Sequence, residues 1–361
     1  MTKLRRMKKS TRTSFFTYGL VIVAFLIIQI LRGTVGIGSL LEGQLIPICA
    51  YIVMAVSLNL VVGISGELSL GHAGFMSVGA FSGCAMANGL QNLVPSEPLR
   101  LVIAILFGAL MAALAGFLIG IPVLRLNGDY LAIVTLAFGE IIKTILTNLY
   151  IGVDANGLQA SFVNDTTDLA EGGIALIKGP MGVSNTSARI STFVAGFILV
   201  MVALIVVFNL VNSRAGRAIM ATRDNRIAAE SVGISVTKYK LMAFTVSAAL
   251  AGAAGTLYGC SQITFSANKF DFNTSILILV FVVLGGLGNM WGSVIAATAL
   301  TILPEALRQF SDYRMLVYAI VLILVMLATN SPAIRSFFLR IVRGGRNEDG
   351  PSRSAKKEAA K

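Results

Sequence analysis

Charge is scarce in this sequence. Only 13% of its 361 residues are charged, against about a quarter in soluble globular proteins, which argues against a water-soluble domain. Histidine occurs once, which argues against a metal site built from several imidazole ligands. The three cysteines, Cys49, Cys84 and Cys260, lie in apolar segments without metal-type spacing. They are predicted to be buried small hydrophobic residues.

Long apolar runs dominate this sequence, which has few charged residues. Hydrophobic residues make up 56% of the chain, and the clearest uninterrupted runs are 15–31, 101–124, 130–151 and 190–211. Each is long enough to cross a bilayer with a hydrocarbon core of about 30 Å. The alternating ten-residue strands of a membrane β-barrel are absent from the sequence. The sequence therefore predicts an all-α polytopic membrane protein.

The net charge of +12 comes from three basic clusters. Six Lys or Arg residues lie in the first twelve positions, six lie in 212–240 and eight follow Pro332. Basic residues beside membrane spans mark the cytoplasmic side, so this distribution indicates topology and not nucleic-acid binding. Both termini are predicted to be cytoplasmic.

The first apolar run follows a basic stretch, a pattern that fits either a signal peptide or a membrane helix. No small-residue cleavage site follows Leu31, and further spans do, so the run is predicted to be the first membrane helix. The predicted organisation is a basic N-terminus (1–14), a transmembrane domain (15–331) and a basic cytoplasmic tail (332–361).

Two cytoplasmic termini require an even number of crossings. An external loop at 152–189 and a cytoplasmic loop at 212–240 fit the charge distribution. The run 274–303 is predicted to form two half-spans broken at "GGLGNMWG" (285–292), which brings the count to about ten crossings. The predicted helices are 15–31, 40–62, 66–88, 101–124, 130–151, 190–211, 241–263, the two halves of 274–303, and 313–330.

Glycine is predicted to act in two ways. "GAFSG" (79–83), "GFLIG" (116–120), "GTLYG" (255–259) and "GNMWG" (288–292) have glycines four residues apart, a spacing typical of close helix packing in membranes. The stretch 63–74 has too many glycines for an ordinary helix, since each costs up to about 1 kcal/mol relative to alanine. We expect a helix break there that faces the interior of the bundle.

Glycine-interrupted spans in transporters point to the translocation pathway. The candidate pathway or gate residues of the two breaks are Gly66, Glu67, Ser69, Gly71, His72, Gly74, Gly285, Gly286 and Gly288.

Among the ionisable residues inside predicted spans are His72, Glu140 and Lys143. His72 is read first as a hydrogen-bonded packing residue and second as a pathway residue; no metal ligation is predicted. Glu140 and Lys143 lie in the middle of a span, where charges are costly and face the interior or each other. Their i, i+3 spacing allows an ion pair, and structural and functional roles for that pair remain open.

The cytoplasmic loop contains a short amphipathic helix. Asp224 or Asn225 can cap a helix formed by "RIAAESV", and Gly233 can end it in a left-handed conformation. A two-turn helix is unstable alone in water, so it is expected to dock on the bundle or on a partner protein. The chain has no G-x-x-x-x-G-K-[ST] sequence, so any ATP would be bound by another chain.

Several blocks of the sequence together resemble one family. They are "SLNLVVGISGELSLGHAGFMSVGAF" (57–81), "RLNGDYLAIVTLAFGEI" (125–141), "SRAGRAIMATRDNRIAAESVGI" continued by "KLMAFTVSAALAGAAGTLYG" (213–259), and more weakly "GGLGNMWGSVIAA" (285–297). The chain resembles the permease subunits of branched-chain amino-acid ABC importers, specifically the larger of the two paired permeases, over roughly residues 40 to 330.

This resemblance implies an importer subunit of a bacterial cell membrane that is not itself an enzyme. Its implied partners are a second permease, two ATP-binding subunits and an extracytoplasmic substrate-binding protein. ATP and Mg would be held by the ATPase subunits, and no cofactor is expected on this chain. The loop helix would enter a groove of the ATPase. The predicted ATPase-coupling residues are Arg223, Asn225, Ala228, Ala229, Glu230 and Gly233.

The chain also departs from the family pattern. Ser293 stands where such permeases usually have proline, and 152–189 matches only loosely. The first alternative is a permease for urea, short amides or another amino acid. The second is a stand-alone secondary transporter, for which Glu140 would suit ion coupling but the docking helix would have no use. A membrane-embedded enzyme is disfavoured because the chain shows no catalytic constellation.

Overall fold

The computed structural model describes most of the chain. The described residues are 9–34, 39–91, 93–126, 128–154, 157–162, 174–184, 190–307 and a few positions between 313 and 323. The chain divides into two compact units, Met1–Glu305 and Ala306–Lys361. The described residues between 316 and 323 are helical, but most of the predicted last helix, 313–330, lies outside the described residues.

The first unit is mainly helical. Its helices are α1 (Lys9–Thr34), α2 (Ser39–Asn59), α3 (His72–Gly89), α4 (Glu97–Val123), α5 (Asp129–Thr147), α6 (Phe193–Asn212), α7 (Arg214–Asp224), α8 (Arg226–Ser231), α9 (Val236–Gly259), α10 (Phe272–Gly285) and α11 (Met290–Ala306, whose last residue belongs to the second unit). Its strands are β1 (Tyr150–Asp154), β2 (Gly157–Ser161), β3 (Ile174–Lys178), β4 (Val183–Ser184) and β5 (Thr264–Phe265).

Six helical segments of the described chain are long and apolar enough to cross a membrane, which agrees with the predicted polytopic membrane protein. They are Glu42–Ser65, Glu97–Val123, Asp129–Thr147, Phe193–Asn212, Val236–Gly259 and Ala267–Gly285. Thr17–Ile30 and Met290–Ala306 are shorter apolar helices. Ten crossings and cytoplasmic termini stay predictions.

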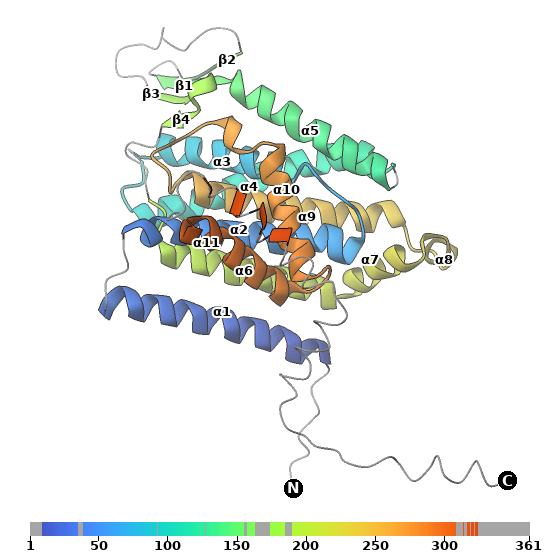
Figure 1. The fold of residues 1–361 in the computed structure, drawn as a ribbon. Helices are drawn as coiled ribbons and strands as arrows, with labels where there is room; N and C mark the ends of the chain where they lie inside the picture. The colour runs from blue at the N-terminus through green and yellow to red at the C-terminus, as the bar shows by residue number, and fades with distance from the viewer. Residues whose placement is uncertain are drawn as a thin grey trace, which may run out of the picture. The chain divides into compact units, whose positions relative to one another are not determined.

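Helix α9 is the centre of the bundle and packs against α2, α3 and α4 (Figure 1). Glycine allows these close contacts, because a Cβ on Gly79 would overlap the backbone of Gly252 and a Cβ on Gly255 would overlap that of Met76. The predicted packing role is thereby confirmed for "GAFSG" and "GTLYG". In "GNMWG", by contrast, Gly288 lies in a turn with φ of 79°.

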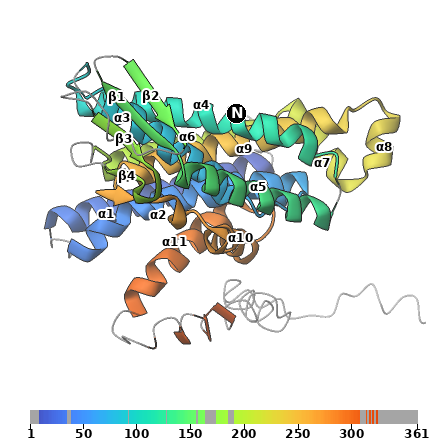
Figure 2. The ribbon, with the colours of Figure 1, turned by 90° about the horizontal axis from the view of Figure 1, so that it is seen from above.

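The segment after α5 contains strands that the sequence analysis did not place. β2, β1 and β3 form an antiparallel sheet in that order, and β4 pairs with β5, with Val183 opposite Phe265. These strands have two to five residues, too few for an alternating pattern to be visible. Figure 2 shows them at the opposite end of the first unit from α8.

Several predicted helix boundaries are wrong by at least four residues. The first helix, predicted from 15, begins at Lys9, and the fourth, predicted from 101, begins at Glu97. The third helix, predicted from 66, begins at His72, because the chain between Gly66 and Gly71 is not helical. The fifth, predicted to reach 151, ends at Thr147, because β1 begins at Tyr150. The seventh, predicted as 241–263, is Val236–Gly259. Hydropathy indicates the apolar part of a helix but not a polar first turn such as the one that follows Ser235.

Candidate functional site

The predicted break after α2 is present. Helix α2 continues as a π-helical turn, Leu60–Ser65, which ends at Gly66 in the left-handed conformation with φ of 76°. The backbone then runs without regular structure to Gly71. Glu67 donates its N–H to Val61 O at 3.1 Å and so closes the turn. Residues 60–71 are called the broken segment below.

The broken segment is largely buried in the bundle, with Gly66 and Leu68 exposed. Its polar side chains Ser65, Glu67 and Ser69 are 2%, 8% and 1% exposed. Non-helical backbone at membrane depth is tolerated only inside protein or beside a water-filled cavity. The hydroxyls of Ser65 and Ser69 find no hydrogen-bond partner among the described residues. Because buried polar groups are nearly always paired, these two hydroxyls mark the broken segment as a place where water or a second arrangement of the chain is needed.

His72, which begins α3, is held by hydrogen bonds within the bundle. Its Nε2 lies 2.8 Å from Ser57 Oγ, and Ser247 Oγ donates to Ser57 O at 2.6 Å. These contacts join α3, α2 and α9, and they agree with the reading of His72 as a packing residue. Within the described residues, no group of three or more His, Cys, Asp or Glu side chains could hold a metal ion.

The second predicted break lies directly against the first. Helix α10 ends at Gly285, Gly286 and Gly288 have φ of 91° and 79°, and α11 begins at Met290. Asn59, which is fully buried, accepts from Gly288 N–H at 2.8 Å and donates to Ser293 Oγ at 2.8 Å. Ser293 thus helps to join the two breaks.

Two basic side chains bind the broken segment from α7 and α9. Arg223, in the last turn of α7, donates from Nη1 to Gly63 O at 2.9 Å. Lys240, in the second turn of α9, forms an ion pair with Glu67, and both side chains are almost fully buried. A Cβ on Gly66 would press on the Arg223 side chain. The broken segment is therefore attached to one residue before α8 and one residue after it.

Helix α8 has the predicted short amphipathic form. Asn225 caps it by accepting from Ala228 N–H at 3.0 Å, and Gly233 ends it with φ of 83° while Ile234 N–H donates to Ala229 O. Ala229 packs inward at 4% exposed. The two large apolar side chains of this segment face outward instead: Ile227 is 80% exposed, and Val232, directly after the helix, is 75% exposed.

Among the predicted coupling residues, the structure thus separates those that face the bundle from those that face outward. Arg223 and Ala229 contact the rest of the chain, Asn225 and Gly233 shape α8, and Ala228 and Glu230 are exposed. Glu230 pairs with Arg226 at 3.1 Å. Ile227 and Val232, which are exposed apolar residues of the same segment, are not among the predicted coupling residues.

Residues Glu140 and Lys143 form the predicted pair on α5, with 2.6 Å between Lys143 Nζ and Glu140 Oε2. The pair does not belong to the broken segment but adjoins it. A Cβ on the preceding residue, Gly139, would lie 3.2 Å from Gly71 Cα, and Thr135 Oγ1 accepts from Leu70 N–H at 3.0 Å. Helix α5 therefore rests on the end of the broken segment.

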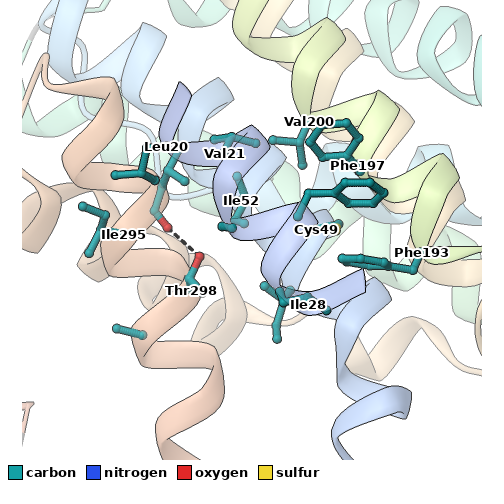
Figure 3. A pocket seen from close by; sticks show the side chains of 15 residues that line it. Leu20, Val21, Ile28, Cys49, Ile52, Phe193, Phe197, Val200, Ile295 and Thr298 are labelled. Carbon is teal, nitrogen blue, oxygen red and sulfur yellow. Dashed lines mark hydrogen bonds between the residues drawn. The ribbon is translucent and has the colours of Figure 1, made fainter. Parts of the chain in front are cut away.

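An apolar cavity of about 290 Å³ lies apart from these residues, between α1, α2, α6 and α11 (Figure 3). Its lining includes Ile28, Ile52 and Phe197 and no charged residue. The hydroxyl of Thr298, which also lines it, donates to Val294 O in its own helix. Nothing in this cavity could compensate the charge of an ionic solute.

The sequence is similar to permeases. The family described as branched-chain amino acid transport system / permease component matches residues 40–326. The high-affinity branched-chain amino acid transport system permease proteins LivM of Salmonella typhimurium and Escherichia coli are each 39% identical, over 77% and 82% of this chain and 66% and 68% of theirs. The match thus spans about two thirds of those relatives.

A more distant relative is named for the import of a different solute. The fructose import permease protein FruG of Bifidobacterium longum is 26% identical over 84% of this chain and 86% of its own length. No solved structure matches the chain.

Proposed function

Because the chain belongs to the permease family of branched-chain amino acid transport systems, we propose that it forms half of the translocation pathway of an ATP-driven importer for leucine, isoleucine and valine. In this proposal a second permease supplies the other half. Two ATPase subunits bind ATP and Mg, and an extracytoplasmic binding protein delivers the amino acid. The complex lies in a bacterial cell membrane.

The observation that carries this proposal is the combination of α8 with its attachment. A six-residue helix that turns Ile227 and Val232 outward has no reason to do so unless another protein covers them. At its base, Arg223 binds the broken segment. A stand-alone carrier has no use for such a helix, which disfavours the secondary transporter.

The contacts suggest how ATP could change access to the pathway. Closure of the ATPase subunits would displace α8 together with α7. Arg223 would carry that displacement to Gly63 O, and Lys240 to Glu67. The broken segment would then shift against α5, where Gly71 meets Gly139. A helix break can absorb such a shift, because its backbone is not locked into a regular hydrogen-bond ladder.

A permease for a different solute remains the second candidate. The relationship to FruG, which is named for fructose import, is the observation in its favour. The helix breaks and the α8 segment belong to the machinery of transport, so they do not by themselves determine the solute. Urea, short amides and other amino acids are the alternatives.

Co-purification tests the importer proposal. The chain is purified from its native membrane in mild detergent, and its companions are identified by mass spectrometry. We expect a second permease and ATP-binding subunits, with the ATPase lost at least tenfold in Ile227→Asp and Val232→Asp. Ile263→Asp is the matched control, because Ile263 is also exposed (61%) but lies next to β5, away from α8. Recovery of the chain alone, or only with copies of itself, would refute the proposal.

The solute is tested separately. The purified complex with its binding protein is placed in vesicles loaded with ATP, and uptake of labelled leucine, isoleucine, valine and urea is compared. Uptake of urea without uptake of the three amino acids would replace the proposed substrate and keep the importer.

A further inference from the structure

Helix α5 lies at the edge of the bundle and has two unlike kinds of exposed side chain. Large apolar residues, Ile133, Ile141 and Ile145, are 61%, 50% and 47% exposed. Among them lies the Glu140–Lys143 ion pair, whose side chains are 41% and 23% exposed. The part of α5 that carries Glu140, Ile141, Lys143 and Ile145 is called the α5 face below.

The α5 face is not suited to lipid. Charged side chains within a membrane span are costly, and in known proteins they face a bundle interior or a water-filled cavity. Helix α4, which is as little buried as α5 in its apolar window, shows what a lipid-facing side of this chain looks like. Its exposed residues between 101 and 123 are all apolar. The charged pair, in the last two turns of α5, thus sets the α5 face apart from the apolar side of α4.

The chemistry of the α5 face matches one class of solute. The ammonium and carboxylate groups of an α-amino acid are attached to the same carbon, and a branched apolar side chain extends from that carbon. A carboxylate and an ammonium one helical turn apart can pair with both charges at once, while Ile141 and Ile145 contact the branched side chain. We propose that the α5 face is a passage site for zwitterionic branched-chain amino acids, with Glu140 accepting from the substrate ammonium and Lys143 donating to its carboxylate.

Electrostatics favours a zwitterion over an ion at this place. Without substrate, Glu140 and Lys143 neutralise each other at 2.6 Å. When a zwitterion enters, each exchanges one partner of opposite charge for another, so the total charge stays the same and no charge is left unpaired. A singly charged analogue would leave one of the two side chains uncompensated. A further charged group, Asp271, lies within electrostatic reach of Lys143 and already caps α10 by accepting from Thr274 N–H.

The position of the α5 face connects it to the moving part of the permease. Gly139 directly precedes Glu140 and lies against Gly71 and Gly74. A shift of the broken segment would therefore move the carboxylate that holds the substrate. This inference rests on the proposed function, and it adds the residues that touch the amino acid.

The test uses the complete importer in ATP-loaded vesicles. Leucine imported and ATP hydrolysed are measured together for Glu140→Gln, Lys143→Met and the control Glu42→Gln, which also breaks an ion pair, Arg32–Glu42, at the ends of α1 and α2. We expect leucine per ATP to fall at least tenfold in both α5 variants. ATPase activity and subunit recovery should stay within twofold, and Glu42→Gln should stay within twofold throughout. A pair with only a structural role would lower uptake, ATPase activity and recovery together, and that result would overturn the proposal.

Direct labelling gives a second readout that does not depend on turnover. A photoreactive diazirine analogue of leucine is delivered by the binding protein, and labelled peptides are identified by mass spectrometry. Label is expected in 129–147 and is expected to fall at least tenfold in Glu140→Gln and in Lys143→Met. Label confined to other helices, unchanged by these substitutions, would refute a role for the α5 face.

Failure of the proposed function is distinguishable from failure of this inference. If the unaltered complex imports no leucine, isoleucine or valine, the proposed substrate is wrong. If it then imports an uncharged solute, the zwitterion site is wrong as well. If the unaltered complex imports leucine and both α5 variants do so equally well, only the inference about the α5 face is wrong.

Discussion

The contact of α3, α4 and α9 and the broken segment are both rich in glycine, yet they use it in opposite ways. In the helical contact, every glycine has ordinary helical geometry and serves to bring backbones together, as where Gly252 meets Gly108 O and Ala112. In the broken segment and its partner turn, Gly66, Gly286 and Gly288 have left-handed φ values that other residues adopt only at a cost.

The surroundings of the two regions differ just as much. The helical contact is lined by apolar or small side chains, with Thr256 as a local exception that donates to Gly79 O. The broken segment is held by Asn59, Arg223 and Lys240, which are polar or charged. Close packing over whole helices gives one arrangement that resists change, whereas a few polar bonds can exchange partners. We therefore expect the helical contact to be rigid and the broken segment to be the part that moves.

The largest effect is expected from a side chain placed in the helical contact. Gly252→Val would drive a Cβ into the backbone of Gly108, so α4 and α9 must separate, at a cost of about 3 kcal/mol or more. The measurement is the free energy of unfolding in a denaturing-detergent titration, together with the amount of folded protein in the membrane. Gly43→Val is the control, because nothing lies within 4 Å of a Cβ there. Equal stability of the two variants would show that the contact is looser than its geometry indicates.

The next effect is expected where the two breaks meet. Asn59→Leu preserves size but leaves the half-buried Gly288 N–H without its acceptor and Ser293 Oγ without its donor. The expected loss is about 2 kcal/mol, the cost of a buried unsatisfied group. Asn212→Leu, at an exposed asparagine that donates to Phe208 O, should change stability by less than about 0.5 kcal/mol. If Asn59→Leu does not lower the free energy of unfolding, the two breaks do not depend on each other.

The sequence predicts the helical contact and the broken segment to different extents. Glycines four residues apart and the apolar runs reveal packed helices, because both are local patterns. The density of glycine with Ser65, Glu67 and His72 likewise revealed the break at 63–74. The partners of the break could not be predicted, because Asn59 and Gly288 are 229 residues apart and Arg223 and Gly63 are 160 apart.

Two basic residues illustrate this limit. Arg223 and Lys240 were read only as marks of topology and of a docking helix, since a charge beside a span has that meaning in most membrane proteins. Only the fold brings them to Gly63 O and Glu67. Asn59 lies just before the predicted break at 63–74, and its local sequence gives no sign of its partners.

An effect of similar size is expected from adding one methyl group to the break. Gly66→Ala must keep a left-handed residue and must displace the Arg223 side chain, so about 2 kcal/mol should be lost. Gly233→Ala has a similar φ of 83° with nothing within 4 Å of its Cβ, and it should lose only about 1 kcal/mol. Thermal unfolding of the two variants isolates the contact with Arg223. If both lose the same stability, Arg223 moves aside freely.

The smallest effect on stability, and the sharpest test of movement, is expected from Arg223→Met. The side chain is 40% exposed, so the loss of its bond to Gly63 O should cost about 1 kcal/mol. Arg217→Met on the same helix, where the lost bond is to Asn212 O nearby, should cost less than about 0.5 kcal/mol. If Arg223 carries displacement from α8 to the broken segment, its variant must hydrolyse ATP yet import less substrate per ATP, while Arg217→Met keeps the ratio. A normal ratio in Arg223→Met would leave Lys240 and Glu67 as the remaining connection, and would place the movement at the start of α9.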